Sequence, residues 1–208
     1  MATTASPYGL VPVKNADGSP YTGARDAFQI ASGLANNIGF GSVVKLHAGR
    51  IEIATGTGAD ETTNNLAVNT GGAIGVFVGC EYVNSQGQLI FDQFFPTATT
   101  VPSDTKIIAY VVTDPGVTFM AQSTGAIADT VIGQNVTFSA AQNATSSVNT
   151  TTGKSNMAIG AAATATKAFK IVGLSDRPGS TAGDDKTDCL IKFNPAYHQY
   201  GTGVVGES

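Results

Sequence analysis

The chain has 208 residues, of which 42% are hydrophobic and only 12% charged, and its formal net charge is −4. Because binding to nucleic-acid phosphates needs clustered Lys and Arg, this composition argues against a nucleic-acid partner. No apolar run approaches the roughly 18 residues that a membrane span requires, so no membrane partner is expected. The length suits one all-β domain, or two small ones, with a substantial core.

The low charge has two interpretations. An average soluble domain has roughly 25% charged residues, so a surface of Thr, Ser, Asn, Ala and Gly favours extensive contact with other subunits. The alternative is an extracellular or thermotolerant β-protein with an uncharged but hydrated surface. The first charged side chain is Lys14, so the start lacks the basic region of a secretory signal, and synthesis in the cytoplasm is expected.

Residues 1–24 contain three prolines and several glycines, which predicts an extended N-terminal arm. Its apolar side chains would be costly to expose, so they are expected to dock onto their own domain or onto a neighbour. The interpretation favoured here is that residues 6–13 lock an assembly together and do not complete the protomer's own core. The residues expected at such an interface, with two tyrosines of the C-terminal tail, are Pro7, Tyr8, Leu10, Val11, Pro12, Val13, Tyr197 and Tyr200.

Beyond the arm, Phe28 and Ile30 indicate a short strand. Residues 43–46 and 50–53 follow as a hairpin closed by His47-Ala48-Gly49. Residues 55–72 have the Gly, Thr and Asn content of a loop.

The clearest strand signal lies at residues 74–83, where every second residue from Ile74 to Tyr82 is apolar. The turn sequence Asn84-Ser85-Gln86-Gly87 follows this run. If these four residues form the loop, Cys80 faces Phe91 in a hairpin over residues 76–92. One face of that hairpin then needs a covering layer. Glycines at Gly75 and Gly79 predict a bulge or the close approach of another backbone. The expected apolar face is Val78, Cys80, Tyr82, Leu89 and Phe91.

Residues 106–112 are apolar enough on both faces to form a central strand. The sequence Asp114-Pro115-Gly116-Val117 is typical of a type II turn, because Pro fixes φ at the second position and Gly accepts a positive φ at the third. The chain is expected to return beside the same strand, which predicts a second hairpin over residues 109–120.

Residues 134–139, 168–174 and 189–193 read as further strands. Residues 140–166 are rich in Ala, Thr, Ser and Asn, which is typical of a flexible linker, but ordered strands with a loose tip are favoured. Helical periodicity is not sustained, so the fold predicted is all-β. We expect a compact antiparallel barrel or sandwich as a body over residues 25–193, followed by a C-terminal tail over residues 194–208.

Candidate chemistry is sparse, and no catalytic, cofactor-binding or metal-binding residues are predicted. His47 and His198 lie far apart without zinc-ligand spacing, so solvated histidines are expected. Cys80 and Cys189 lie in apolar runs, where a buried free thiol is the common case and a disulfide the alternative. The carboxylates Asp184, Asp185 and Asp188 could hold a cation, but Lys186 and Arg177 in the same loop offer pairing instead.

Several segments resemble one family when taken in order. They read SPYGLVPV at residues 6–13, VFVGCEYV at 76–83, AYVVTDPGVTF at 109–119, KIVGLSDRPG at 170–179 and CLIKFN at 189–194. Together they are similar to the structural cement, or head-decoration, proteins of tailed bacteriophages.

The resemblance implies a non-enzymatic protein on the outer capsid surface of the virion, which forms homotrimers and clamps neighbouring major capsid protein subunits. Two other classes stay open. A virion surface module for a host receptor or glycan should carry a concave site with aromatic or charged anchors. An enzyme is the third class, and no motif supports it.

Overall fold

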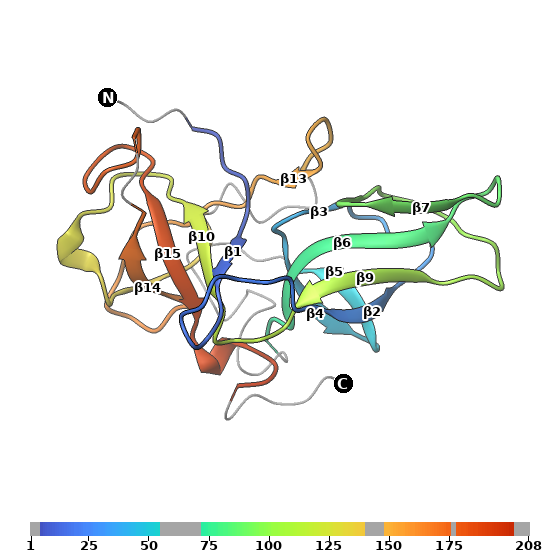
Figure 1. Cartoon of the computed structure of the whole chain (residues 1–208), viewed down its shortest axis with the longest axis horizontal. Coiled ribbons are helices and arrows are strands. Elements are labelled where there is room, and N and C mark those ends of the chain that lie inside the picture. The colour runs from blue at the N-terminus through green and yellow to red at the C-terminus, as the bar shows by residue number, and fades with distance from the viewer. Residues whose placement is uncertain (1–4, 55–71, 140–147, 176–177, 202–208) are drawn as a thin grey trace.

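The computed structural model describes residues 5–54, 72–139, 148–175 and 178–201. Its elements are almost entirely strands, so the all-β prediction is confirmed. Figure 1 shows two groups of strands side by side, with a barrel in one half, an open sheet in the other and the N-terminal segment between them. No helix in the described part of the chain has the length and apolar character needed to cross a membrane.

Five strands close the barrel. Their order is β4-β5-β2-β9-β6, and β6 pairs back onto β4 through Val43 opposite Val76 and Val44 opposite Gly75. The pairings are antiparallel except for one parallel contact between β2 and β5. A further strand, β7 (Leu89–Asp92), continues the sheet beyond β6. The barrel strands are β2 (Asp26–Ile30), β4 (Val43–His47), β5 (Arg50–Ile53), β6 (Gly75–Val83) and β9 (Ile107–Val112).

Local sequence explains several of these elements. The β4–β5 hairpin closes through Ala48 and Gly49, both with positive φ (48° and 72°), which is the type I′ geometry that matches the twist of the paired strands. Gly75 lies so close to β9 that a Cβ there would be 2.1 Å from the carbonyl oxygen of Val112. The β6–β9 register also shifts between Phe77 and Gly79. The predicted bulge and close backbone approach are therefore both confirmed.

The other half is a five-stranded antiparallel sheet in the order β1-β10-β15-β14-β11. Its strands are β1 (Val11–Lys14), β10 (Thr118–Gln122), β11 (Asn135–Val136), β14 (Phe169–Leu174) and β15 (Asp188–Phe193). Short pairings join β3 (Ile38–Gly39) to β8 (Phe94–Phe95) and β12 (Val148–Asn149) to β13 (Lys154–Ser155). Two single-turn 3₁₀ segments, η2 (Asp129–Val131) and η4 (Pro195–Tyr197), complete the fold.

The two halves share a core where they meet. Val44, Phe77 and Val111 belong to the cluster inside the barrel. Their neighbours Val43, Val76 and Val112 belong to the cluster that covers the five-stranded sheet. Strands β4, β6 and β9 are therefore buried on both faces at this end, where β9 finishes with the consecutive buried residues Val111 and Val112.

Two predictions about hairpins were wrong. In the β6–β7 hairpin Val83 pairs with Leu89 and Cys80 with Asp92, one residue away from the expected register. The side chain of Asn84 accepts hydrogen bonds from the amides of Gln86 and Gln88, at 3.0 and 2.9 Å. The Asn84 amide also donates to the Gln88 carbonyl at 2.9 Å, so the loop has three residues and not four.

The expected hairpin over residues 109–120 does not form, because β9 and β10 belong to different sheets. The turn at Asp114 is present, with the Val117 amide donating to the Asp114 carbonyl at 3.2 Å. Gly116 is not among the residues with positive φ, so the turn is not of type II. It carries the chain out of the barrel and into the five-stranded sheet.

Other expectations were met in part. Residues 148–166 contain the β12–β13 pair and the buried Met157 and Ile159, in agreement with ordered strands, while residues 140–147 lie outside the described residues. The loop expected at residues 55–72 also lies outside them, except for Gly72. His47 is exposed as expected, but His198 is fully buried, so the expectation of a solvated histidine was wrong there.

Candidate interface at the junction of the two sheets

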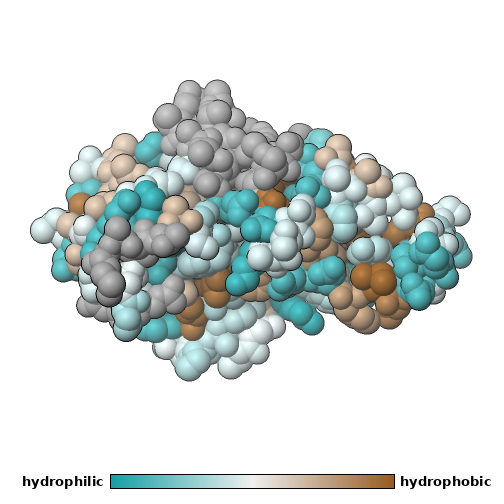
Figure 2. Space-filling view, turned by 90° about the horizontal axis from the view of Figure 1, so that it is seen from above, coloured by the Kyte–Doolittle hydropathy of each residue, from teal (hydrophilic) through white to brown (hydrophobic). Residues whose placement is uncertain are grey.

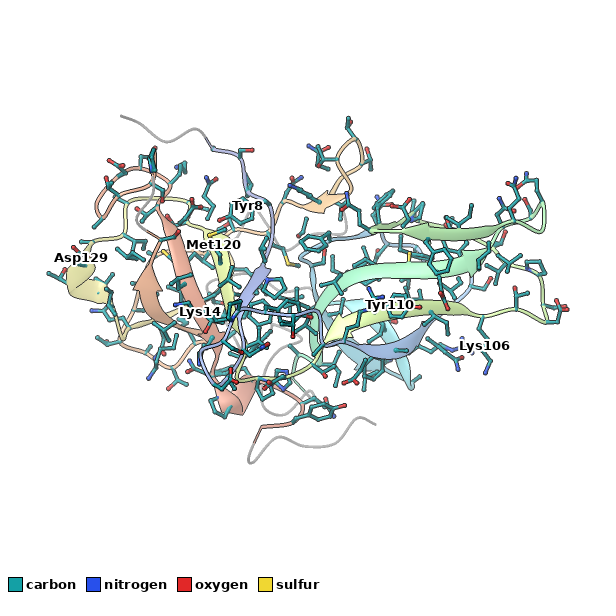
Figure 3. The ribbon with its side chains drawn as sticks, in the orientation of Figure 1. Tyr8, Lys14, Lys106, Tyr110, Met120 and Asp129 are labelled. Atoms are coloured by element: carbon teal, nitrogen blue, oxygen red, sulfur yellow. The ribbon has the colours of Figure 1, made fainter. Side chains whose placement is uncertain are left out.

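The N-terminal segment is built into its own chain. Leu10 is fully buried in the cluster that covers the five-stranded sheet, and Val11 lies opposite Met120 on β10. Nearer the terminus, the Tyr8 hydroxyl donates to the Asp188 carboxylate at 2.7 Å. The expectation that residues 6–13 do not complete the protomer's own core was therefore wrong for Leu10. Figure 3 shows Tyr8 and Lys14 along the segment, between the two sheets.

The other residues named for an interface lie in different environments. Pro7, Pro12 and Val13 are half-buried. Tyr197 is buried, with its ring in the same cluster as Leu10. Tyr200 is 59% exposed and lies against the His198 ring, with 5.8 Å between the ring centres. Their contact with another subunit stays a prediction.

Val11 and Pro12 do line a surface cleft of about 320 Å³. The cleft lies where the N-terminal strand meets the start of β2 and the middle of β6. Most of its lining is apolar, and two of its residues, Arg25 and Val78, also line a second cleft. The remaining residues around the first cleft are Tyr21, Gly23 and Phe40.

The second cleft has a volume of about 260 Å³ and extends toward β7. The Arg25 guanidinium lies 4.1 Å from the centre of the Tyr110 ring, a cation–π contact that holds both side chains at the rim. A hydrogen bond to the Glu81 carboxylate, with a smaller contribution from burial, raises the pKa of Tyr110. We call the two clefts together the junction groove. The second cleft is completed by Gly79, Cys80, Phe91, Asp92 and Gln93.

Strand β7 forms the far border of this surface. It pairs with β6 alone among the described strands, so its other edge is open. Because Asn84 and Gln88 form a hydrogen-bonded pair, alternation along an antiparallel ladder directs the backbone N–H and C=O groups of Leu89 and Phe91 toward the open edge. Their side chains are 57% and 67% exposed. Figure 2 shows hydrophobic surface in separate patches, one of them on the barrel side of the molecule.

The two cysteine thiols are held in unreactive environments. Burial, with a smaller effect of Asp92, raises the pKa of the Cys80 thiol to about 12, and burial does the same for Cys189, so both remain protonated at neutral pH. Both cysteines are free and buried, in agreement with the sequence prediction. Within the described ranges, no group of three or more His, Cys, Asp or Glu side chains is arranged to hold a metal ion. In the loop that contains Asp184 and Asp185, the Lys186 ammonium group pairs with the Asp185 carboxylate at 3.0 Å.

Sequence reasoning found Val11 and Pro12 but missed Tyr21, Arg25 and Tyr110. No spacing in the sequence brings these residues together, because they come from a loop, a strand start and a central strand. Comparisons of the chain with models of protein families, with curated proteins and with solved structures found no match in any of the three.

Proposed function

We propose that this chain is a non-enzymatic structural cement, or head-decoration, protein of a tailed bacteriophage. It binds the outer surface of the assembled capsid as a homotrimer and clamps neighbouring major capsid protein subunits, which stabilises the particle. We infer this family because the five segments named in the sequence analysis resemble it and follow one another in order along the chain.

The open edge of β7 is the observation that best supports a role in assembly. An unpaired edge with two exposed apolar side chains is a template for another strand, and natural monomers usually protect such edges with charges or prolines. Between Leu89 and Phe91 lies Ile90, which is also apolar and uncharged. The edge continues into the junction groove through Phe91, so a partner could bury both surfaces at once.

A modest contact is sufficient on a capsid. Each bound subunit raises the effective concentration of the next site, so a weak interface repeated over a shell gives high avidity. Burial of one Phe side chain contributes about 1.5–3 kcal/mol, or more than tenfold in affinity per site.

The test is co-sedimentation of the purified full chain with particles of the phage that encodes it. Deletion of the N-terminal segment would be a poor perturbation, because it removes Leu10 from the core and β1 from its sheet. We therefore choose Phe91→Ser on β7. The matched control is Val172→Ser on β14 in the other sheet, where the native Val172 is 42% exposed.

We expect wild type and Val172→Ser to sediment with the particles, and Phe91→Ser to bind at least roughly tenfold more weakly. The mass of the unbound protein by light scattering should equal three chains. The proposal fails if the wild-type chain stays in the supernatant, and the role of β7 fails if both variants bind like wild type.

A further inference from the structure

A third cleft lies at the outer end of the barrel, away from the five-stranded sheet. Its volume is about 340 Å³, and its lining is mainly polar. Figure 3 shows Lys106 at this end of the molecule, far along β9 from the five-stranded sheet. The cleft is lined by Gln29, Ile30, Ser32, Arg50, Val101, Pro102, Ser103, Thr105, Lys106 and Ile107.

The charges in this cleft are of one sign. Arg50 and Lys106 both line it, no acidic side chain does, and neither cation has an ion-pair partner among the residues that the structure describes. The nearest acid along β5, Glu52, is bound to His47 at 2.9 Å. Asp104 is exposed in the neighbouring loop and does not line the cleft. Two cations in one cleft, without an acidic partner in the described part of a chain of net charge −4, favour binding of an anion.

The walls of the cleft are held in place by hydrogen bonds. The Gly33 amide donates to the Thr99 carbonyl at 2.8 Å, and the Val101 amide donates to the Ser32 hydroxyl oxygen at 3.3 Å. Thr105 donates both its amide and its hydroxyl to the Pro102 carbonyl, at 3.0 and 2.9 Å. The loop over residues 99–106 is therefore fixed before any ligand binds, which lowers the entropic cost of binding.

We propose that this cleft binds an acidic sugar, a monosaccharide or chain-terminal residue that carries a carboxylate. Arg50 and Lys106 bind the carboxylate, and the guanidinium offers the paired donors that a carboxylate accepts. Ser32 has no acceptor for its hydroxyl hydrogen among the described residues, and Ser103 and Gln29 also present polar groups. These groups are suited to bind ring hydroxyls.

Other anions fit the cleft less well. A phosphate site is usually built on a run of free backbone amides, and two of the amides that line this cleft, those of Val101 and Thr105, already donate elsewhere. An extended acidic peptide would need a long groove, while a cleft of about 340 Å³ is near the lower limit for a small-molecule site. The inference goes beyond the proposed capsid role and does not depend on it, because the isolated chain would bind the sugar.

The experiment is a titration of the full chain, by calorimetry or ligand-observed NMR at low salt. The probes are glucuronic acid and N-acetylneuraminic acid, with glucose and N-acetylglucosamine as neutral controls. Inorganic phosphate and an Asp-rich peptide serve as competing anions. The variants are Arg50→Gln and Lys106→Gln, and the matched control is Lys170→Gln, an exposed lysine on β14 in the other sheet. Thermal unfolding of each variant reports whether it is folded.

We expect at least one acidic sugar to bind with a Kd on the order of 1 mM, and neutral sugars to bind at least roughly tenfold more weakly. Arg50→Gln should lose about tenfold or more in affinity, while Lys170→Gln should match wild type. Equal binding of acidic and neutral sugars, or tighter binding of phosphate or peptide, would overturn the assignment of ligand. Absence of acidic-sugar binding, or wild-type affinity in folded Arg50→Gln and Lys106→Gln, would overturn the site itself.

Discussion

His198 should make the protein sensitive to acid. Its side chain is fully buried, and its Nδ1 accepts a hydrogen bond from the Tyr200 amide at 3.2 Å, while Nε2 is buried without a partner. The imidazole lies edge-on to the Phe193 ring, with 5.0 Å between the ring centres. Burial lowers the pKa of His198 from 6.5 to about 4, against a smaller opposing effect of the Asp114 carboxylate.

The direction of the effect follows from this shift. A histidine whose pKa is lower in the folded state favours folding in its neutral form, so its contribution is complete above pH 6.5 and is lost as the pH falls toward 4. A change from 6.5 to about 4 corresponds to about 3 kcal/mol of unfolding free energy. Protonation of His198 would disturb the C-terminal segment next to it, which is held to the rest of the chain by the Gln199 amide donating to the Ala73 carbonyl at 2.7 Å.

The perturbation is His198→Phe, which keeps a ring but cannot be protonated. Urea unfolding, followed by circular dichroism at steps between pH 7 and pH 4, gives the free energy of unfolding for both proteins. Effects of the carboxylates other than Asp114 are common to both and cancel in the difference. We expect the wild type to lose about 3 kcal/mol more than the variant over this range, and His47→Asn, at an exposed position, to behave like wild type. Parallel curves for wild type and His198→Phe would refute the reasoning.

Three further predictions concern stability and thiol chemistry. Gly75→Ala should destabilise the fold by about 1–3 kcal/mol or more, because its methyl group would meet the Val112 carbonyl oxygen. Gly125→Ala, with open space around it, should cost less than about 0.5 kcal/mol in the same urea assay. Leu10→Ala should cost about 2–5 kcal/mol by the same assay, and a loss near zero would contradict its place in the core. The two cysteines should react with a thiol reagent only after unfolding, and rapid labelling of the native protein would contradict their burial.

The strands themselves could be predicted from the sequence, but their partners could not. Residues 106–112 were correctly identified as a central strand, because an apolar run on both faces needs burial on both sides. The Asp114-Pro115-Gly116 sequence correctly indicated a turn. Whether a turn reverses the chain beside itself or passes it to another sheet depends on packing between distant segments, and local sequence does not encode that packing.

The β6–β7 register shows how a small local error changes the surface. A loop shorter by one residue moves every β7 side chain to the opposite face, because side chains alternate along a strand. Leu89 and Phe91 were expected on a covered face and are exposed instead. The deciding signal was Asn84, whose side chain closes the loop by accepting two backbone amides, as Asn commonly does in turns.

Apart from Val11 and Pro12, the junction groove could not be predicted, for a reason that also bears on its function. Its residues lie at positions 11–12, 21–25, 40, 78–80, 91–93 and 110, and a period-two pattern says which face a residue occupies but not which strand lies beside it. The groove exists because β1 joins one sheet while β2, β6 and β9 close the barrel next to it. A partner that binds there contacts both halves of the molecule at once. Its binding energy therefore depends on the two halves keeping their relative position, and the core they share through Val43, Val76 and Val112 provides that rigidity.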